Sequence, residues 1–323
     1  MCANLLAMLF YLRAILDLFL PRECLACGCR LGLRERHLCL ACAADVPYTY
    51  HWLSAHNPLA DRFNAVLERH RPADERMDYA YAAALMHYKG PYRAIPRALK
   101  YHGDLAAGRF FGGLLGRRLA FAPHFADVDL IIPVPLHWTR RRSRGYNQAE
   151  ILARAICDAF CHSEKTGGVC SCHSEGLEGA SYCHSEKTEG RRKNLPSFVQ
   201  CRSDILLRAR RTRTQTKLTI EQKARNVASA FQVSFAPIHR DASSHPLLDA
   251  FRHLLLDALH LPRLDRESPQ EALAHARHIL LVDDTFTTGA TLYACYAALR
   301  PYTSARISIA TLAAVEGTPS SGP

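Results

Sequence analysis

Residues 278–291 read HILLVDDTFTTGAT, and this stretch decides the fold. Its four apolar residues at 279–282 are typical of a strand that is buried on both faces of a sheet. Two carboxylates and a short Thr/Gly loop follow, and the apolar run at 292–299 predicts a helix. Strand, loop and helix in this order predict an open α/β sheet. Its ligand site is expected at the carboxyl end of the strand, where the acids and the loop meet.

The loop after this strand has the chemistry of a phosphate and sugar site. Free N–H groups at the start of a helix favour a phosphate, and Gly289 lets the backbone approach a ligand closely. The carboxylates of Asp283 and Asp284 can accept hydrogen bonds from the vicinal hydroxyls of a ribose. Further hydroxyl donors are Thr287, Thr288 and Thr291. A ribose 5-phosphate ligand would use both halves of the segment. The alternative is an Asp-rich turn whose threonines cap the next helix.

The segment resembles the phosphoribosyl-pyrophosphate (PRPP) signature of type I phosphoribosyltransferases, in which four hydrophobic residues precede two acids and a Thr/Gly loop. The resemblance implies that the acid pair holds the ribose hydroxyls and that residues 287–291 wrap the 5-phosphate. The implied PRPP-binding residues are Asp283, Asp284, Thr285, Thr287, Thr288, Gly289, Ala290 and Thr291. No general base is evident, because Thr287 stands where some members of that family carry an aspartate.

The composition of the 323-residue chain is that of a globular protein with a basic balance of charge. Hydrophobic residues make up 48% and charged residues 22%, which is ordinary for a globular chain. The formal net charge of +11 predicts attraction to polyanions, which include nucleic acids, nucleotides and PRPP. Charge alone does not choose among these ligands.

The first twenty residues are apolar, yet they lack the pattern of a secretory signal. No positive charge precedes the apolar run, and Arg13 and Asp17 interrupt it. Leucines at helical spacing predict an amphipathic helix that packs on the body, and no segment is expected to span a membrane. Thirteen cysteines without a secretory signal predict a reducing compartment, and we expect a cytoplasmic protein.

Four cysteines near the N-terminus have the spacing of a zinc module. They form two Cys-x2-Cys knuckles, and they are Cys24, Cys27, Cys39 and Cys42. Two such pairs complete a tetrahedral site without a coordination position for water, so a bound Zn²⁺ is expected to be structural. Four free thiols or two disulfides are the alternatives. Cys29 is spare in this interpretation, and His37 is a possible substitute ligand.

A second buried strand is predicted at 128–132, and a basic segment follows it. Four arginines fall within residues 140–144, and the spacing of 149–160 predicts a helix. Strand, basic loop and helix form the first half of a βαβ unit. Arginines at this end of a strand would neutralise a pyrophosphate through forked hydrogen bonds, and we expect Arg141 and Arg144 to make them. The alternatives are a solvated loop or a contact with nucleic acid.

Residues 208–217, RARRTRTQTK, form a third basic element that leads into a predicted helix ending near Ala230. As a mobile arm, this element would close over a reaction centre and exclude water. A basic, hydroxyl-rich arm is equally typical of a nucleic-acid contact. The sequence leaves both interpretations open.

Taken together, these motifs resemble the ComF family of competence-associated, phosphoribosyltransferase-like proteins, whose GntX-type relatives share the layout. The motifs are the cysteine knuckles, KYHGD at 100–104, RGYNQ at 144–148, QTKL and RNVASAF within 215–231, and LVDDTFTTGAT. The resemblance covers residues 24–314 in the family's order. It implies a type I phosphoribosyltransferase-like α/β domain, with a parallel sheet flanked by helices, after a small zinc module. PRPP with Mg²⁺ is the implied ligand, and DNA uptake is the implied process.

The predicted organisation is two units with two inserts. An N-terminal helix and the cysteine module occupy 1–75, and the phosphoribosyltransferase-like domain occupies 76–316. A Cys-His-Ser-Glu motif begins at 161, 172 and 183 within a polar stretch, which predicts a disordered insert over about 161–200. A second insert, over about 236–276, contains an apolar stretch at 247–261 that predicts an additional helix.

Two functions of different classes follow from these features. The first is a phosphoribosyltransferase-like protein that binds PRPP, or a related ribose 5-phosphate ligand, with Mg²⁺; if it is active, catalysis would be positional and electrostatic. The alternative is a non-enzymatic DNA-uptake factor that binds single-stranded DNA or a helicase partner through its basic arms. Aromatic residues that would stack on bases are sparse beside the arginines, with Tyr146 as the close one.

Overall fold

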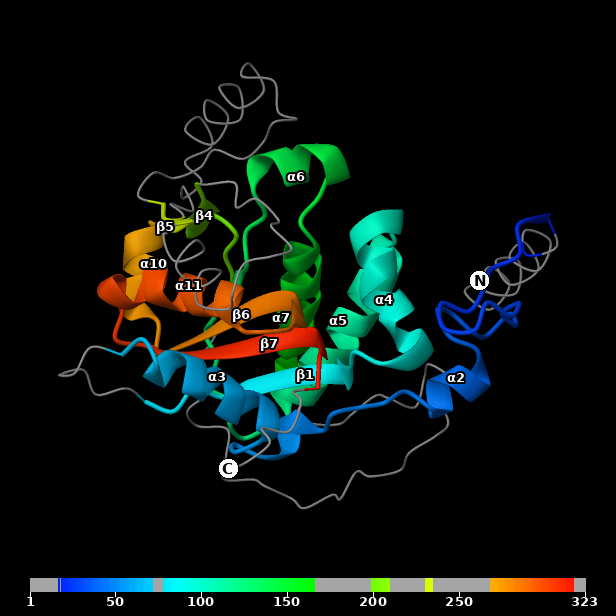
Figure 1. Ribbon diagram of the computed structural model, residues 1–323, viewed down its shortest axis with the longest axis horizontal. Coiled ribbons are helices and arrows are strands. Elements are labelled where there is room, and N and C mark those ends of the chain that lie inside the picture. Colours follow the sequence, from blue (N-terminus) through cyan, green and yellow to red (C-terminus); the bar gives the residue numbers. More distant parts are fainter. Residues whose placement is uncertain are drawn as a thin grey trace.

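The fold is built on a parallel β-sheet with helices on both faces, as Figure 1 shows. The structure is a computed structural model that describes residue 17 and residues 19–71, 78–165, 199–209, 230–234 and 268–316. Five parallel strands are hydrogen-bonded in the order β1-β7-β6-β2-β3. Their bounds are β1 Ala82–His87, β2 Leu130–Pro133, β3 Gln200–Cys201, β6 His278–Phe286 and β7 Arg306–Ala314. The predicted α/β class, a parallel sheet flanked by helices, is therefore confirmed.

The two strands predicted from apolar runs are neighbours in this sheet. β2 pairs with β6 in a register that places Leu130 opposite Ile279. β6 is longer than predicted, because it continues through both acids to Phe286. β7 lies along its other edge and supplies backbone partners there, with Asp283 opposite Thr311. The acids therefore belong to the end of the strand, and the loop begins only after them.

Alternate residues of the strands enter two hydrophobic cores, one on each face of the sheet. Three helices pack in the first core, namely α3 (Pro58–Glu68), α10 (Pro269–His275) and α11 (Ala290–Leu299). The second core contains the long helices α5 (Leu105–Ala120) and α7 (Gln148–Lys165). In β6, Ile279 and Leu281 belong to the first core, whereas Leu280 and Val282 belong to the second. Burial on both faces explains why this strand is a continuous apolar run.

α5 and α7 pack closely because small residues of α5 face α7. Gly112 and Gly116 lie one helical turn apart, and both are buried. A Cβ atom at Gly116 would lie 2.7 Å from the Cα of Ile156 and 2.8 Å from the Cβ of Ala159. These backbone and short side-chain atoms cannot rotate aside. Glycine at this position therefore sets the distance between the two helices.

Gly116→Ala is expected to lower the free energy of unfolding by about 1–2 kcal/mol. Overpacking costs about 1–3 kcal/mol, and the higher helix propensity of alanine returns at most about 1 kcal/mol. Gly113→Ala is the matched control, because a Cβ there would lie 3.7 Å from the flexible end of the Arg117 side chain. This variant should raise the free energy of unfolding. Urea denaturation compares the two variants, and equal stabilities would contradict this role of Gly116.

A buried histidine joins two strands at the amino end of the sheet. His278 Nδ1 lies 2.6 Å from Asp127 Oδ1, and its Nε2 lies 2.7 Å from Ser308 Oγ on β7. Asp129 accepts hydrogen bonds from the backbone N–H groups of Arg277 and His278. His278 and Ser308 have no exposed surface. This Asp–His–Ser arrangement therefore stabilises the sheet and is closed to a substrate.

The cysteine module joins the second core. Its helical elements are α2 (Leu40–Ala44) and η1 (His51–Leu53). Cys24, Leu31 and Leu38 are buried in the same cluster as α5 and α7, and Tyr48 forms an isolated bridge with Met86 of β1. Module and sheet thus share one continuous core. After β1 the chain reaches α5 through η2 (Gly90–Arg93), α4 (Ala94–Arg97) and η3 (Ala98–His102).

The basic segment after β2 is helical, where the sequence analysis expected a loop. α6 spans Trp138–Arg144 because His137 caps its first turn by accepting the Thr139 N–H, and Gly145, with φ of 80°, ends it. α7 begins at Gln148 and continues to Lys165, and β3 begins at Gln200. Both ends of the predicted repeat insert are therefore regular structure, and residues 166–198 lie outside the described residues.

A small antiparallel sheet contacts α11. Its strands are β4 (Leu206–Arg208) and β5 (Phe231–Val233), and η4 (Arg300–Tyr302) follows α11. The rest of the basic arm with its predicted helix, the predicted helix at 247–261 and the N-terminal helix up to residue 16 lie outside the described residues. Within the described ranges, no helix is both long and apolar enough to cross a membrane.

Candidate functional sites

The two acids of β6 lie at its carboxyl end but on opposite sides of the strand. Because side chains alternate along a strand, Asp283 lies on the side of α11 and Asp284 on the side of α5. Lys100, on the π-helical η3, places its Nζ 2.9 Å from Asp284 Oδ1 and donates to Thr285 Oγ1 at 3.5 Å. The backbone N–H of Asp284 donates to Asp283 Oδ1 at 2.8 Å. Each acid therefore has its own partners.

Asp283 occupies an environment that resists ionisation. Burial, followed by the charge of Asp284, raises the pKa of Asp283 to about 7, although Lys100 and Arg208 oppose the increase. Burial also lowers the pKa of Arg208 on β4, and the charge of Arg140 on α6 lowers it further. Cations from η3 and β4 therefore lie near the end of β6, and Arg140 of α6 lies near Arg208.

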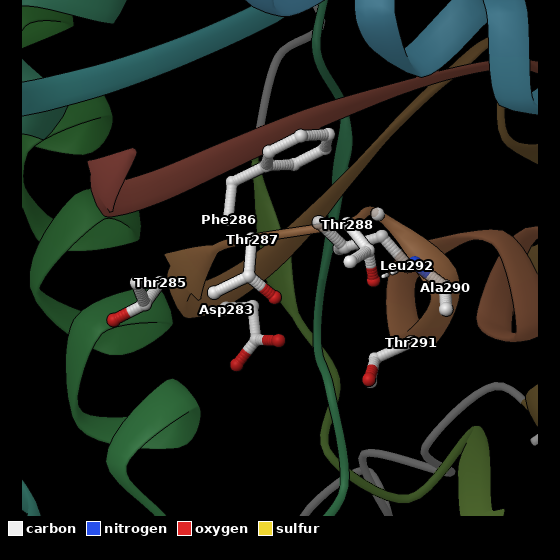
Figure 2. Close-up of a pocket in the computed structure, with 9 residues that line it drawn as sticks. Asp283, Thr285, Phe286, Thr287, Thr288, Ala290, Thr291 and Leu292 are labelled. Carbon is white, nitrogen blue, oxygen red and sulfur yellow. Dashed lines mark hydrogen bonds between the residues drawn. The ribbon is translucent and has the colours of Figure 1, made fainter. Parts of the chain in front are cut away.

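The loop after β6 forms an open pocket at the start of α11. Figure 2 shows the carboxylate of Asp283 and the hydroxyls of Thr287 and Thr291 on the same side of the loop, whereas the ring of Phe286 points away. The pocket is lined by Asp283 and by residues 285–292. Every residue predicted to bind PRPP ribose or phosphate therefore lines this pocket, except Asp284.

Glycine is required where the loop enters α11. Gly289 has a φ of 78°, which side chains rarely adopt, and a Cβ there would lie 3.0 Å from the ring of Phe286. The neighbouring Ala290 N–H is 3.5 Å from Thr288 Oγ1. The backbone of this turn therefore requires glycine at 289, whereas the close approach to a ligand stays a prediction.

Arg62 of α3 fixes the loop from behind. Its guanidinium donates to the carbonyl oxygens of Thr287 at 2.7 Å and of Val315 at 2.6 Å. The same group lies over the ring of Phe286, 5.1 Å from its centre. The loop is thereby tied both to α3 and to the residue that follows β7.

The two arginines predicted to bind pyrophosphate lie on α6, above the carboxyl edge of the sheet (Figure 1). Arg144 places its guanidinium 5.5 Å from the ring centre of Tyr101. Arg141 accepts the Gly145 N–H through its carbonyl oxygen and so takes part in ending α6. The α6 arginine that influences the acid cluster, through Arg208, is Arg140. Pyrophosphate binding by Arg141 and Arg144 stays a prediction.

The sequence did not predict that Lys100, Arg208 or Arg62 lies near the acid pair or its loop. A usable signal existed for Lys100, which comes just before the Gly103 turn and the Asp104 cap of α5. Arg208 opens the third basic element, but only the fold brings it to β6. Arg62 lies in an ordinary amphipathic helix and has no distinguishing sequence signal.

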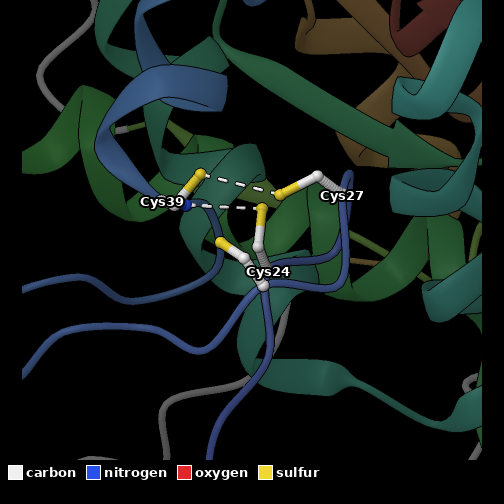
Figure 3. A group of neighbouring side chains, drawn as sticks. Cys24, Cys27 and Cys39 are labelled. Atoms are coloured by element: carbon white, nitrogen blue, oxygen red, sulfur yellow. Dashed lines mark hydrogen bonds between the residues drawn. The ribbon is translucent and has the colours of Figure 1, made fainter.

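The N-terminal cysteines form a candidate metal centre. Figure 3 shows the side chains of Cys24, Cys27 and Cys39 gathered together. The Sγ atoms of Cys27 and Cys39 are 3.8 Å apart, and the Cys39 N–H donates to Cys24 Sγ at 3.4 Å. Tetrahedral zinc with Zn–S bonds of about 2.3 Å separates its sulfurs by about 3.8 Å, so this spacing fits the metal. A hydrogen bond from the Cys29 backbone lowers the pKa of Cys27 to about 6, which favours the thiolate that a metal binds.

A group of four cysteines that could hold a metal ion is confirmed, but its membership differs from the prediction. The four sulfurs that all lie within 4.8 Å of one another belong to Cys24, Cys27, Cys29 and Cys39. Cys29, which the spacing left spare, is therefore a member. Cys42, which the spacing predicted, lies on α2 beside this group. Its thiol is close to those of Cys24, Cys27 and Cys39.

His37 does not take part in this centre. Its Nδ1 lies 3.9 Å from Asp104 Oδ2, and its ring packs 5.2 Å from the ring of Phe110 on α5. Burial lowers the pKa of His37, which favours the neutral ring. We therefore assign His37 to the packing of the module on α5.

Comparison with known proteins finds no relative that would supply a function. No family model matches the chain. No curated protein and no solved structure matches it either. The functional assignment rests on the residues and the geometry described above.

Proposed function

We propose that this chain is a phosphoribosyltransferase-like protein that binds PRPP, or a related ribose 5-phosphate ligand, at the carboxyl end of β6. The observation that carries the proposal is the meeting of Asp283 with a threonine loop in one pocket at the start of α11 (Figure 2). The resemblance of this loop to the PRPP signature supports the same ligand. The wider resemblance to the ComF family supports a role in DNA uptake.

The loop is suited to the 5-phosphate. The start of α11 presents backbone N–H groups and the positive end of the helix dipole, both of which favour an anion. The hydroxyls of Thr287 and Thr291 are on the pocket side. Arg62 holds the loop from behind and is not among the lining residues. The phosphate would therefore be bound mainly by neutral donors.

Asp283 is suited to the ribose hydroxyls and to Mg²⁺, because its carboxylate lines the pocket and carboxylate oxygens are the ligands that Mg²⁺ prefers. Asp284 lies on the other side of β6, outside the residues that line the pocket, and would act on the ligand through its charge. The ion would offset the negative charge of the ligand. Lys100, at 2.9 Å, neutralises Asp284 and so reduces repulsion between the acid pair and a polyanion. In a transfer reaction, Arg140 and Arg208 would stabilise the charge of the departing pyrophosphate.

Thermal unfolding with PRPP and Mg²⁺ tests this proposal. Ligand at about a hundredfold excess over its Kd should raise the free energy of unfolding by about 2.7 kcal/mol. Asp283→Asn should weaken binding by about ten- to a hundredfold, because Asp283 lines the pocket and a hydrogen bond to a charged group contributes about 1.5–3 kcal/mol. Asp158→Asn, on the exposed surface of α7, removes the same charge and should leave binding unchanged. Failure of millimolar PRPP to protect the wild-type protein would overturn the proposal.

The cysteine group supports a second element of the proposal, a structural Zn²⁺. Four thiols at tetrahedral spacing would supply every ligand, which leaves no position for a reacting water molecule. All cysteines within the described residues are free thiols, as expected in a reducing compartment such as the cytoplasm.

The surface of α6 favours a second candidate function, the binding of single-stranded DNA. Trp138 is 64% exposed and Tyr101 is 71% exposed, so two aromatic side chains are available beside the arginine helix. Arg144 lies over the ring of Tyr101. Tyr146, the aromatic residue singled out in the sequence, is half-buried and donates its hydroxyl proton to the Leu99 carbonyl. Exposed aromatics beside cations are typical of sequence-tolerant single-strand binding.

Trp138→Ala is expected to weaken binding of a single-stranded oligonucleotide by about 1–3 kcal/mol, the contribution of one stacked base. Phe121→Ala is the control, since Phe121 is 54% exposed at the opposite, C-terminal end of α5 and has no place in this surface. Fluorescence anisotropy at several salt concentrations measures both variants. Affinity that does not fall steeply with salt would remove the electrostatic basis of this function. Asp283→Asn, which should weaken PRPP binding, should leave the affinity for the oligonucleotide unchanged.

A further inference from the structure

Five thiols occupy a corner of the module where a tetrahedral metal needs four. Cys24, Cys27 and Cys39 are common to both possible sets. The thiol of Cys29 completes one set, in which all four sulfurs lie within 4.8 Å of one another. The thiol of Cys42 lies close enough to interact with the same three thiols and could complete a second set. One of the five must therefore be left out when the metal is bound.

The backbone holds both competing thiols firmly in place. Cys29 lies in a tight hairpin, in which its carbonyl oxygen accepts the Cys24 N–H at 2.8 Å and Gly28, with φ of 74°, makes the turn. Cys42 lies in the first turn of α2, and Cys39 is the N-cap of the same helix. Both side chains are already close to the other thiols, so neither loses much conformational entropy when it binds the metal.

We propose that the fourth coordination position of this centre is shared between Cys29 and Cys42, with Cys24, Cys27 and Cys39 as permanent ligands. The inference rests on the proposed zinc site and goes beyond it, because a closed structural site has a single ligand set. The ligand is a soft divalent ion such as Zn²⁺, which prefers thiolates. Exchange lets one thiolate arrive as the other leaves, so the metal keeps four sulfur ligands while one cysteine is free to react.

Differential alkylation of the zinc-loaded wild-type protein tests this sharing directly. Trypsin separates the two thiols, because Cys29 lies in the peptide 23–30 and Cys42 in the peptide 37–62. Limited iodoacetamide is applied to the native protein, and a second reagent then marks the remaining thiols after unfolding. We expect one early label per centre, divided between Cys29 and Cys42. Early label on Cys29 alone, or on Cys42 alone, would overturn the proposal.

Zinc content of purified variants provides the second test. Cys29→Ala and Cys42→Ala should each retain one zinc per chain, whereas the variant with both substitutions should lose the zinc. Cys39→Ala removes a permanent ligand, so this single substitution should be enough to lose the zinc. Loss of zinc from only one of the two single variants, Cys29→Ala or Cys42→Ala, would show that the centre has a single ligand set. That result would overturn the sharing but not the zinc site itself. Absence of zinc from the wild-type protein would overturn the zinc site and the sharing together.

Discussion

Asp283→Asn is expected to stabilise the ligand-free protein above pH 7 while it weakens ligand binding. The pKa of Asp283 is raised from 3.8 to about 7 in the folded state, first by burial and then by Asp284. The folded protein therefore holds this proton more tightly than the unfolded chain does. Stability from this group is greatest below about pH 4 and falls as the pH rises to about 7, where the full cost of the buried charge is reached.

Asparagine has no charge to bury, so the stability difference between variant and wild type should grow from pH 4 to pH 7 and then level off. The rise of the pKa of Asp283 from 3.8 to about 7 sets an upper bound of about 4 kcal/mol on this difference. Urea denaturation at several pH values measures it, with Asp158→Asn as the control for a surface charge. A difference that stays constant between pH 4 and pH 8 would contradict the raised pKa. If the same variant is no longer protected by PRPP, the carboxylate that costs stability is also the one that binds the ligand.

Loss of the metal is expected to destabilise the whole N-terminal module, and Cys24→Ser is the sharpest way to cause it. Cys24 is only 3% exposed, accepts the Cys39 N–H and packs in one core with Leu31 and Leu38. In small zinc domains the metal contributes about 10–16 kcal/mol of apparent binding free energy, so the module should lose its fold without it. Because this core continues into α5 and β1, the remaining domain should also lose stability.

Trypsin provides the readout, because Arg30, Arg34 and Arg36 lie inside the module. Cleavage at these sites should accelerate strongly in Cys24→Ser and in wild-type protein treated with a chelator, while zinc content falls. Cys157→Ser is the control: Cys157 lies on α7, and a serine there can keep the hydrogen bond to the Val199 carbonyl. Unchanged cleavage of metal-free protein would show that the module folds without zinc.

The sheet was predictable because burial on both faces leaves a mark in the sequence. The runs around Ile131 and Leu280 are apolar throughout, and both became neighbouring central strands. The length of β6 was not predictable, because Asp283 and Asp284 are held in the strand by the backbone of β7, which a local pattern does not contain. In the same way, five consecutive polar residues at 140–144 suggested a loop, and the caps at His137 and Gly145 made it a helix.

The site was predictable only where its residues are contiguous. The threonine loop has its phosphate chemistry within a few residues, so the sequence identified it. Lys100 and Arg208 lie far from β6 in sequence, and only the topology brings them to the acids. The metal centre shows the limit of spacing rules: Cys-x2-Cys pairs predicted Cys42, whereas the turn at Gly28 brings the Cys29 sulfur within 4.8 Å of the sulfurs of Cys24, Cys27 and Cys39.

The position of Arg62 has a thermodynamic consequence. It lies on the stretch of chain that leads from the cysteine module to the sheet, and it donates to the loop at Thr287 and to Val315 beyond β7. The proposed metal at one end and the proposed ligand at the other would therefore act on one connected segment. Linkage is reciprocal: any factor by which the metal changes the affinity for the ligand must equal the factor by which the ligand changes the affinity for the metal.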